Sequence, residues 1–258
     1  MKMKLKNIML ISLVLLVFLT ISAASATDNS VTISNSDYAA TNVDSNMNFG
    51  GENPSSNSVN IYVNTTGSDD GAGSKESPYN SLNKAISSVT ETQDTVIYLS
   101  EGTFSGEKNT NLNIDSSGGS LTIIGQGSDK TFIDGKYTGI VFTSMSKNSL
   151  VTLKDIAFVN CNSSTAAQNQ APVITSNAIL TIENCVFENN YGTDAYGAIY
   201  QRSNNLTVIN STFKDNSNLN RAGAIRAEGL DNVNLINNTF INCYGRSSNT
   251  QGSSVYFK

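Results

Sequence analysis

The sequence predicts an all-β fold, a parallel β-helix in which the backbone winds as a solenoid of stacked coils. Four similar segments carry a phenylalanine at the same place, in steps of 29, 26 and 27 residues: Phe158, Phe187, Phe213 and Phe240. A fixed repeat of this length is typical of solenoids, in which no unit can bury its apolar face alone. Within each segment apolar and polar residues alternate with a period of two, which indicates strands.

A second short strand precedes each of these segments and also repeats. These strands begin in steps of 26, 26 and 30 residues, at Ala171–Ile174, Gly197–Tyr200, Gly223–Arg226 and Ser253–Tyr256. Each coil therefore carries at least three strands: one around Val173 or Ile199, one at the Leu-Thr-Ile type of sequence, and one at the phenylalanine. The stack is predicted to start at Thr95–Leu99.

Stacking places like residues above one another and predicts what each column does. Leu153, Ile182, Val208 and Leu235 should point inward with the phenylalanines. Two polar columns should form the corners, since Asn and Asp tolerate left-handed backbone and can bond between coils: Asp155, Asn184, Asn210 and Asn237 in one, Asn160, Asn189, Asp215 and Asn242 in the other. Asn190 and Asn216 form a further polar column. We interpret these columns as structural ladders rather than as a binding site.

The N-terminus has the pattern of a secretory signal over residues 1–26. Lys2, Lys4 and Lys6 precede an apolar run from residue 8 to 21, and Ala24-Ser25-Ala26 offers a cleavage site. The run is shorter than the ~20 residues that span a bilayer, which favours cleavage over an uncleaved anchor. Cleavage would change the net charge from −5 to −8 by removing three lysines. Such an acidic chain lacks the basic surface that nucleic acid or anionic lipid requires. We expect a secreted, extracellular or cell-surface protein.

The rest of the chain divides into a lead-in and a solenoid. Residues 27–58 are rich in Ser and Asn without a sustained period, and we expect them to be unstructured. Residues 59–258 should form the β-helix, with a cap over 59–94, coils over 95–258 and an incomplete last coil. Leu82, Ala85, Ile86 and Val89 follow the spacing of a short amphipathic helix. Its apolar stripe would cover the open end of the stack, which is otherwise an aggregation hazard.

The three cysteines are predicted to be unpaired and buried. Cys161 and Cys243 share a column but lie three coils apart, roughly 14 Å at ~4.8 Å per coil. This separation exceeds the ~7 Å limit between Cα atoms that a disulfide can bridge. Cys185 lies in a different column.

The chain resembles known β-helix families. The segment Ile61-Tyr-Val, Gly67-Ser-Asp-Asp-Gly, Ser77-Pro-Tyr and Leu82-Asn-Lys-Ala-Ile is similar to the N-terminal cap of the pectin-lyase-like superfamily. The Gly-Ala-Ile and Phe-x-Asn-Asn elements resemble the repeats of polymorphic outer-membrane proteins and of adhesin-like surface proteins of methanogenic archaea. The resemblance covers about residues 59–258. It implies a right-handed parallel β-helix with a short N-terminal capping helix, and an adhesin-like role.

Enzymes share this fold, so we looked for a catalytic site. A pectate-lyase-like site needs several carboxylates for Ca²⁺, which takes six to eight oxygen ligands, and an inverting glycosidase needs two carboxylates ~6.5–9.5 Å apart. The repeats hold few outward-facing acidic residues, namely Glu183, Glu188, Asp194, Glu228 and Asp231. No column contains two of these carboxylates on adjacent coils. The chain has no histidine. We therefore predict no catalytic, cofactor-binding or metal-binding residues, and no cofactor.

Two features leave alternatives open. Arginines, acids and tyrosines gather in or near the loops and second strands: Arg202, Arg221, Arg226, Asp194, Glu228, Tyr191, Tyr196 and Tyr200. They could form a sugar-binding face, with tyrosines stacking on pyranose rings, or an ordinary solvated face. Asp69 and Asp70, in a glycine-flanked loop, could bind a cation or simply form a turn.

Five sequons match the N-glycosylation pattern: Asn64, Asn162, Asn205, Asn210 and Asn237. Because Asn210 and Asn237 lie in a predicted corner ladder, their side chains should be occupied. Asn64 and Asn162 are therefore the better predicted acceptors.

We interpret the chain as a secreted or surface-displayed, adhesin-like protein that presents a rigid face to glycans or surface proteins of other cells. One alternative is a carbohydrate-active enzyme, a polysaccharide lyase or glycoside hydrolase of the pectin-lyase-like superfamily. Another is a truncated fragment of a larger surface protein. The open last coil also predicts end-to-end self-association.

Overall fold

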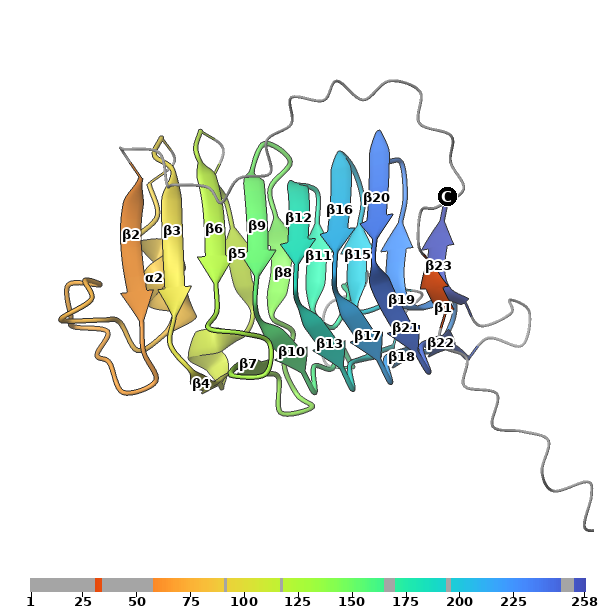
Figure 1. Ribbon diagram of the computed structural model, residues 1–258, viewed down its shortest axis with the longest axis horizontal. Helices are drawn as coiled ribbons and strands as arrows, with labels where there is room; N and C mark the ends of the chain where they lie inside the picture. Colours follow the sequence, from red (N-terminus) through yellow and green to blue (C-terminus); the bar gives the residue numbers. More distant parts are fainter. Residues whose placement is uncertain are drawn as a thin grey trace, which may run out of the picture.

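A computed structural model describes residues 31–33, 58–90, 92–116, 118–164, 170–193, 196–246 and 253–258. The predicted signal segment 1–26 lies outside these residues, as does the lead-in 27–58 apart from residues 31–33 and 58. The described chain is a parallel β-helix with very little helix (Figure 1). In Figure 1 the front strands run downward and the rear strands upward while the chain advances from left to right, so the coil is right-handed.

Three long sheets form the walls of the solenoid. Sheet B contains β2 (Val59–Val63), β3 (Thr95–Leu99), β6 (Ser120–Ile124), β9 (Leu150–Lys154), β12 (Ile179–Glu183), β16 (Asn205–Ile209) and β20 (Asn232–Ile236). Sheet A contains β4 (Gly102–Ser105), β7 (Thr131–Asp134), β10 (Ala157–Val159), β13 (Val186–Glu188), β17 (Thr212–Lys214), β21 (Asn238–Ile241) and, at its end, β1 (Val31–Ile33).

The third wall and one corner complete each coil. Sheet C contains β5 (Leu112–Ile114), β8 (Phe142–Met145), β11 (Ile174–Ser176), β15 (Ile199–Gln201), β19 (Ala222–Ala227) and β23 (Ser253–Phe257). The small sheet D lies between sheets A and C in chain order and contains β14 (Tyr191–Gly192), β18 (Ser217–Asn218) and β22 (Tyr244–Gly245).

The phenylalanine column is confirmed. Phe158, Phe187, Phe213 and Phe240 are register partners on adjacent strands of sheet A. Their rings stack with centroid distances of 5.0, 4.7 and 5.0 Å along the column, and all four side chains are buried. Burial of each ring contributes about 1.5–3 kcal/mol, and stacking adds about 0.5–1.5 kcal/mol per pair. The column therefore joins four successive coils through one continuous core.

The apolar column of sheet B is confirmed in the same way. Leu153, Ile182, Val208 and Leu235 are aligned by the register of β9, β12, β16 and β20. The first three are fully buried, whereas Leu235 is half-buried because it lies in the edge strand β20.

The expected register of sheet C is wrong at β11, the first of the four predicted second strands. Ile174, not Val173, pairs with Ile199, although the next pairs, Ile199 with Ile225 and Ile225 with Val255, follow the expectation. Both Val173 and Ile174 are buried in the core, so a bend before β11 directs two successive apolar residues inward. A repeat alignment without gaps cannot place such an extra residue.

The predicted corners adopt the expected backbone conformation. All eight Asn and Asp residues of the two corner columns have positive φ, between 49° and 59°. This is the left-handed region, which Asn and Asp tolerate better than other side chains. The corners are thus set by residue type.

The inter-coil ladder is only partly as predicted. Asn184 Nδ2 donates to Asp155 Oδ1 at 3.1 Å, and Asn242 Nδ2 to Asp215 Oδ1 at 3.0 Å. Asn210 and Asn237, however, are exposed, and within the described structure their side chains donate no ladder hydrogen bond. The expectation that these two side chains are occupied is wrong, because the corner turns them toward solvent.

The predicted further polar column of Asn190 and Asn216 is confirmed as a buried amide ladder, one residue beyond the corner column. Asn190 Nδ2 donates to Asn216 Oδ1 at 2.9 Å and to Phe158 O at 3.1 Å, and Asn216 Nδ2 donates to Phe187 O at 2.8 Å. Asn238 does the same at the other corner, donating to Val208 O at 2.8 Å. These buried amides satisfy backbone groups that the corners leave without strand partners.

The predicted capping helix is present as α2 (Leu82–Ser87), with Ser81 as its N-cap. Ser81 Oγ accepts a hydrogen bond from the Lys84 backbone N–H at 3.2 Å. Leu82 and Ala85 are fully buried, and the helix contacts β2, β5 and the 3₁₀ helix η1 (Glu107–Asn109). The helix covers the left end of the solenoid in Figure 1.

The prediction of three unpaired, buried cysteines is confirmed: Cys161, Cys185 and Cys243 are free and buried. No helix of the described residues is long and apolar enough to cross a membrane.

Candidate functional site

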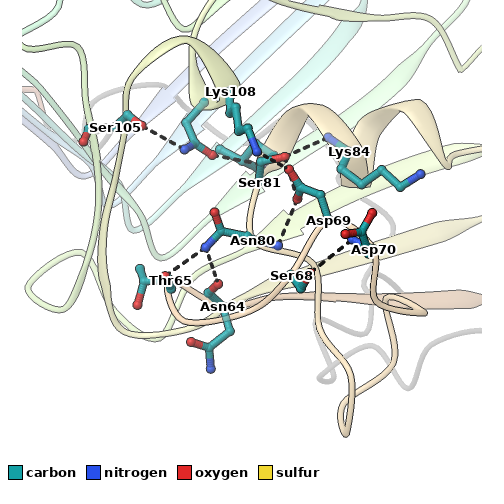
Figure 2. Close-up of polar contacts among 12 residues, drawn as sticks. Asn64, Thr65, Ser68, Asp69, Asp70, Asn80, Ser81, Lys84, Ser105 and Lys108 are labelled. Carbon is teal, nitrogen blue, oxygen red and sulfur yellow. Dashed lines mark hydrogen bonds and ion pairs between the residues drawn. The ribbon is translucent and has the colours of Figure 1, made fainter.

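The Asp69 loop packs against the cap of the solenoid (Figure 2). Asp69 Oδ1 accepts hydrogen bonds from the Asn80 backbone N–H at 3.1 Å and from Ser81 Oγ at 3.0 Å. Its Oδ2 pairs with Lys108 Nζ at 2.9 Å. Burial alone would raise the pKa of this carboxyl, but the hydrogen bonds from Lys108, Ser81 and Asn80 outweigh it, and the pKa is lowered.

The Asp69 carboxylate therefore connects its loop to the N-cap residue of α2 and to Lys108 of η1. Asp70 is exposed, and its backbone N–H donates to Ser68 Oγ at 3.3 Å, which closes a turn. Both Asp69 oxygens already have partners, so the structure favours the turn over a cation site. Within the described ranges no three His, Cys, Asp or Glu side chains gather where they could hold a metal ion.

The second strands bring most of the predicted arginine and tyrosine residues together on the outer face of sheet C. Tyr200, Arg226 and Tyr256 are successive register partners on β15, β19 and β23. They alternate with Ile199, Ile225 and Val255, which face the core. Strand alternation therefore places the three polar and aromatic side chains on one outward column.

Arg226 is the centre of this column. Its guanidinium carbon lies 4.6 Å from the ring centroid of Tyr196 and 5.3 Å from that of Tyr200. Its Nε donates to Glu228 Oε1 at 3.0 Å, and the Tyr200 hydroxyl donates to Glu228 Oε2 at 2.8 Å. A cation between aromatic rings and a carboxylate is held firmly in one orientation.

The burial of these side chains determines whether the cluster can contact a ligand directly. Tyr196, Tyr200 and Arg226 are only 9%, 6% and 7% exposed. Neither tyrosine ring therefore offers an open face to a sugar. The cluster is a rigid support below the surface rather than the contact surface itself.

The ionisation of this cluster argues against acid–base chemistry near neutral pH. Burial, together with the hydrogen bond to Glu228, raises the pKa of Tyr200 to about 12. Burial would raise the pKa of Glu228, but the hydrogen bonds from Arg226 and Tyr200 lower it overall. Tyr200 therefore stays protonated and Glu228 stays ionised, whereas a general acid or base needs a pKa near the working pH.

The exposed groups lie at the margins of the buried cluster. The exposed Arg202 lies with its guanidinium carbon 5.7 Å from the Tyr200 ring centroid. Arg221 lies 5.3 Å from the ring of Tyr256, and its Nη1 donates to the Tyr256 hydroxyl at 3.3 Å. Both arginines are at least partly accessible to solvent.

Tyr191 lies at the neighbouring corner, not on sheet C. It starts β14 of sheet D, where the register places it in one column with Ser217 and Tyr244. The guanidinium carbon of Arg246 lies 5.8 Å from the ring centroids of both Tyr191 and Tyr244. Tyr244 is 43% exposed, so this corner does present an aromatic and cationic surface.

The corner is continuous with the sheet C column. An added Cβ at Gly223 would meet the backbone N of Tyr244, and one at Gly245 would meet the backbone of Arg221. Glycine at these two positions therefore allows β22 and β19 to approach closely. We call the resulting set the corner surface; Tyr244 and Arg246 are its exposed members, and Tyr191, Arg221 and Tyr256 are half-buried.

Sequence reasoning missed three members of the corner surface. Tyr256 occupies the repeat position of Tyr200 and Arg226, and Tyr244 occupies that of Tyr191, so both could have been found by extending the columns. Nothing in the repeat pattern indicates Arg246. Asp194, one of the predicted members, lies outside the described residues.

The remaining outward-facing acidic residues lie apart from one another. Glu183 pairs with Lys154 at 3.0 Å, and Glu188 pairs with Lys214 at 2.7 Å, each between adjacent coils. Asp231 is exposed beyond β19. Among the described residues these acids form ion pairs or stand alone, not as paired catalytic carboxylates.

The structure reverses the expected order of the sequons. Asn64 and Asn162 are half-buried, and their side-chain oxygens accept hydrogen bonds from Thr66 N and Ser164 N. Asn205 is half-buried and accepts from Asn232 Nδ2 at 3.4 Å. Of the five sequon asparagines, Asn210 and Asn237 are the exposed ones.

No protein-family model and no curated protein sequence matches the chain. Among solved structures the chain is similar to a protein described as a rhamnogalacturonan lyase, with 15% sequence identity and a TM-score of 0.37. The alignment covers 78% of this chain and 62% of that protein, so this chain spans less than two thirds of the length of the lyase. At this level the similarity assigns neither a family nor an activity to the chain.

Proposed function

We propose that the protein is a secreted, adhesin-like binding protein that presents the corner surface to a glycan on another cell. The observation that carries this proposal is the exposed pair Tyr244 and Arg246 at the corner beside β19, the strand that holds the buried Arg226. An accessible tyrosine beside a guanidinium can stack on a sugar ring and hydrogen-bond its oxygens. A surface protein of another cell is the alternative partner within the same proposal.

Rigidity supports the proposal. Tyr191 and Tyr244 stand two coils apart, about 9–10 Å at ~4.8 Å per coil, and parallel pairing to β18 holds both strands. A surface whose side chains are already ordered loses little conformational entropy on binding. The guanidiniums of Arg221 and Arg246 favour a partner that carries negative charge or many acceptor oxygens.

The test is binding by the purified chain to a glycan array, followed by affinity measurements on any glycan that binds. We expect Tyr244→Ala combined with Arg246→Ala to weaken binding at least about 10-fold, since loss of a central aromatic or arginine contact costs more than about 1 kcal/mol. The matched control is Tyr98→Ala combined with Lys154→Ala, which removes a tyrosine and a cation from sheet B. Equal loss in both variants, or no glycan bound, contradicts a glycan-binding corner surface; cell binding that resists glycan removal would favour the protein partner.

A carbohydrate-active enzyme is the second candidate, and the same glycans test it. Release of unsaturated products or new reducing ends by the purified chain would support a polysaccharide lyase or glycoside hydrolase. The ionisation of Tyr200 and Glu228 provides no group suited to proton transfer near neutral pH, which is why we place binding first.

A further inference from the structure

One strand pair differs from all the others. β1 pairs with β21 in antiparallel orientation, with Val31, Thr32 and Ile33 opposite Phe240, Thr239 and Asn238. Every other strand pair of the described residues is parallel. β1 comes from the lead-in before the cap, yet it lies at the right end of the solenoid in Figure 1, opposite α2. The start of the described chain therefore closes sheet A at the end furthest from the cap.

This end of the solenoid has features that promote association. β20 and β23 are the edge strands of sheets B and C there, and an unpaired edge is a template for pairing with another chain. Between them lies an open hollow of about 620 Å³, lined by apolar side chains that include Leu230, Val233, Leu235 and Phe257. Phe257 is 54% exposed. Without β1, sheet A would add a third open edge, β21.

We propose that Val31–Ile33 is a tethered edge strand that closes β21 within the same copy and thereby limits end-to-end association of copies. The pairing is of backbone to backbone, so it can compete directly with a strand from a second copy. A tethered strand competes well because its effective concentration near β21 is high, in the millimolar range for suitable tethers.

The tether is long enough for pairing within one copy. Twenty-four residues separate Ile33 from Ser58, next to β2, and they can span up to roughly 80 Å when extended. From β2 to β20 there are six steps along sheet B, or about 29 Å at ~4.8 Å each. The reach thus exceeds the length of the solenoid by a wide margin.

The first test is a disulfide across the observed register. Thr32→Cys with Thr239→Cys places cysteines at partner positions, where antiparallel Cα atoms are about 4.5–5.5 Å apart and can be bridged. We expect oxidation at low protein concentration to give an intramolecular disulfide, seen by peptide mass spectrometry in a band of monomer mass. Thr32→Cys with Thr212→Cys is the matched control, since Thr212 occupies the same column one coil away and should cross-link far less.

Two outcomes of the cross-linking test would contradict the proposal. Disulfide-linked dimers from the register pair would show that the strand is exchanged between copies, which overturns closure within one copy. Equal cross-linking in the register pair and the control, or none in either, would overturn the pairing itself.

The second test addresses association. Thr239 donates its backbone N–H to Ser211 O on the other side of β21, so the hydrogen-bonded partners of β1 are Val31 with Phe240 and Ile33 with Asn238. Ile33→Pro therefore removes a backbone N–H that pairs with β21 and opposes strand pairing, whereas Ser45→Pro places a proline in the same lead-in outside β1. Sedimentation velocity over a concentration series should show oligomers of Ile33→Pro at concentrations at least about 10-fold lower than for the unchanged chain or Ser45→Pro. Equal thermal midpoints confirm that the solenoid is intact. Indistinguishable sedimentation of the three proteins would show that β1 does not protect this end.

Discussion

At the scale of single residues, Asn and Asp at the corners act through backbone conformation before they act through hydrogen bonds. Asn184 and Asn210 occupy equivalent corners with φ of 52° and 50°. Asn184 bonds to Asp155 in the coil before it, whereas Asn210 is exposed. What the two residues share is the left-handed backbone, so conformation and not amide bonding explains the repeat.

Replacing Asn210 tests this reasoning. Alanine in the left-handed region costs about 1–2 kcal/mol, so we expect Asn210→Ala to lower the thermal midpoint by about 2–8 °C. Asn210→Gly, which has no such cost in the folded state, should change it by less than about 1 °C. A calorimetric comparison decides between the two causes: if glycine destabilised as much as alanine, the side chain and not the backbone would be what matters.

The cysteines illustrate burial at the same scale. Desolvation by burial raises the pKa of the Cys185 thiol to about 12, and it also raises the pKa values of Cys161 and Cys243. The thiolate is the reactive form, so all three thiols should be inert in the folded protein.

Thiol titration at pH 8 checks this expectation. The folded chain should react negligibly over the time in which a free thiol reacts fully, and the chain unfolded in guanidinium without reductant should titrate three thiols. Rapid reaction before unfolding would show that a cysteine is accessible. Fewer than three thiols after unfolding would reveal a disulfide.

At the scale of elements, the cap is held to the coils by polar ties as well as by apolar burial. Asp69 connects its loop to the N-cap residue Ser81 and to Lys108 of η1. The ion pair lies at the surface, where Lys108 is 66% exposed, so its own contribution is small. The carboxylate matters mainly because it positions the start of α2.

Asp69→Asn should therefore destabilise the protein in a pH-dependent way. The folded pKa of Asp69 is lowered from 3.8, so its contribution is present above pH 3.8 and is lost as the pH falls below it. We expect a loss of up to about 1 kcal/mol at pH 7 that becomes smaller as the pH falls below 3.8 and is therefore smaller at pH 3 than at pH 7. Thermal unfolding of the unchanged chain, Asp69→Asn and the control Asp70→Asn at both pH values measures it.

Two results would contradict this role of Asp69. One is a difference between the unchanged chain and Asp69→Asn that stays constant from pH 7 to pH 3. The other is a rise in thermal midpoint on adding Ca²⁺ that Asp69→Asn abolishes, which would restore a cation site at this loop.

At the scale of the whole molecule, the two ends of the solenoid are treated differently. α2 buries Leu82 and Ala85 against the first coils, which covers apolar surface at that end. At the other end β1 covers only the edge of sheet A, and the hollow beside Phe257 stays open. We therefore propose that association along the solenoid axis occurs at this second end and that β1 limits it.

The corner surface also belongs to this scale, because no single coil contains it. Tyr191 lies two coils before Tyr244 and Tyr256, and Arg221 lies in the coil between them, so the strand pairings that stack these coils bring the members together. The repeat predicted that Tyr196, Tyr200, Arg226 and Glu228 could gather, and they do. It did not show that Tyr196, Tyr200 and Arg226 are buried, and this burial moves the contact surface to the margins of the cluster.

The sequence by itself determined the solenoid, because every coil repeats the same local requirements. Alternating apolar residues, a phenylalanine and two Asn or Asp corners recur at intervals that only stacked coils satisfy. These requirements are local, so Phe187, Asn184 and the capping helix around Leu82 could be located without a structure.

Only the tertiary structure decided which repeated side chains are covered and what pairs with the ends of the stack. The solvent exposure of a side chain depends on the neighbouring coils and loops. For this reason Asn210 is exposed whereas Asn216 is buried, and Tyr200 is buried whereas Tyr244 is exposed. The pairing of β1 with β21 joins residues about 200 positions apart through backbone groups, and backbone pairing leaves no mark in the side chains from which a repeat is recognised.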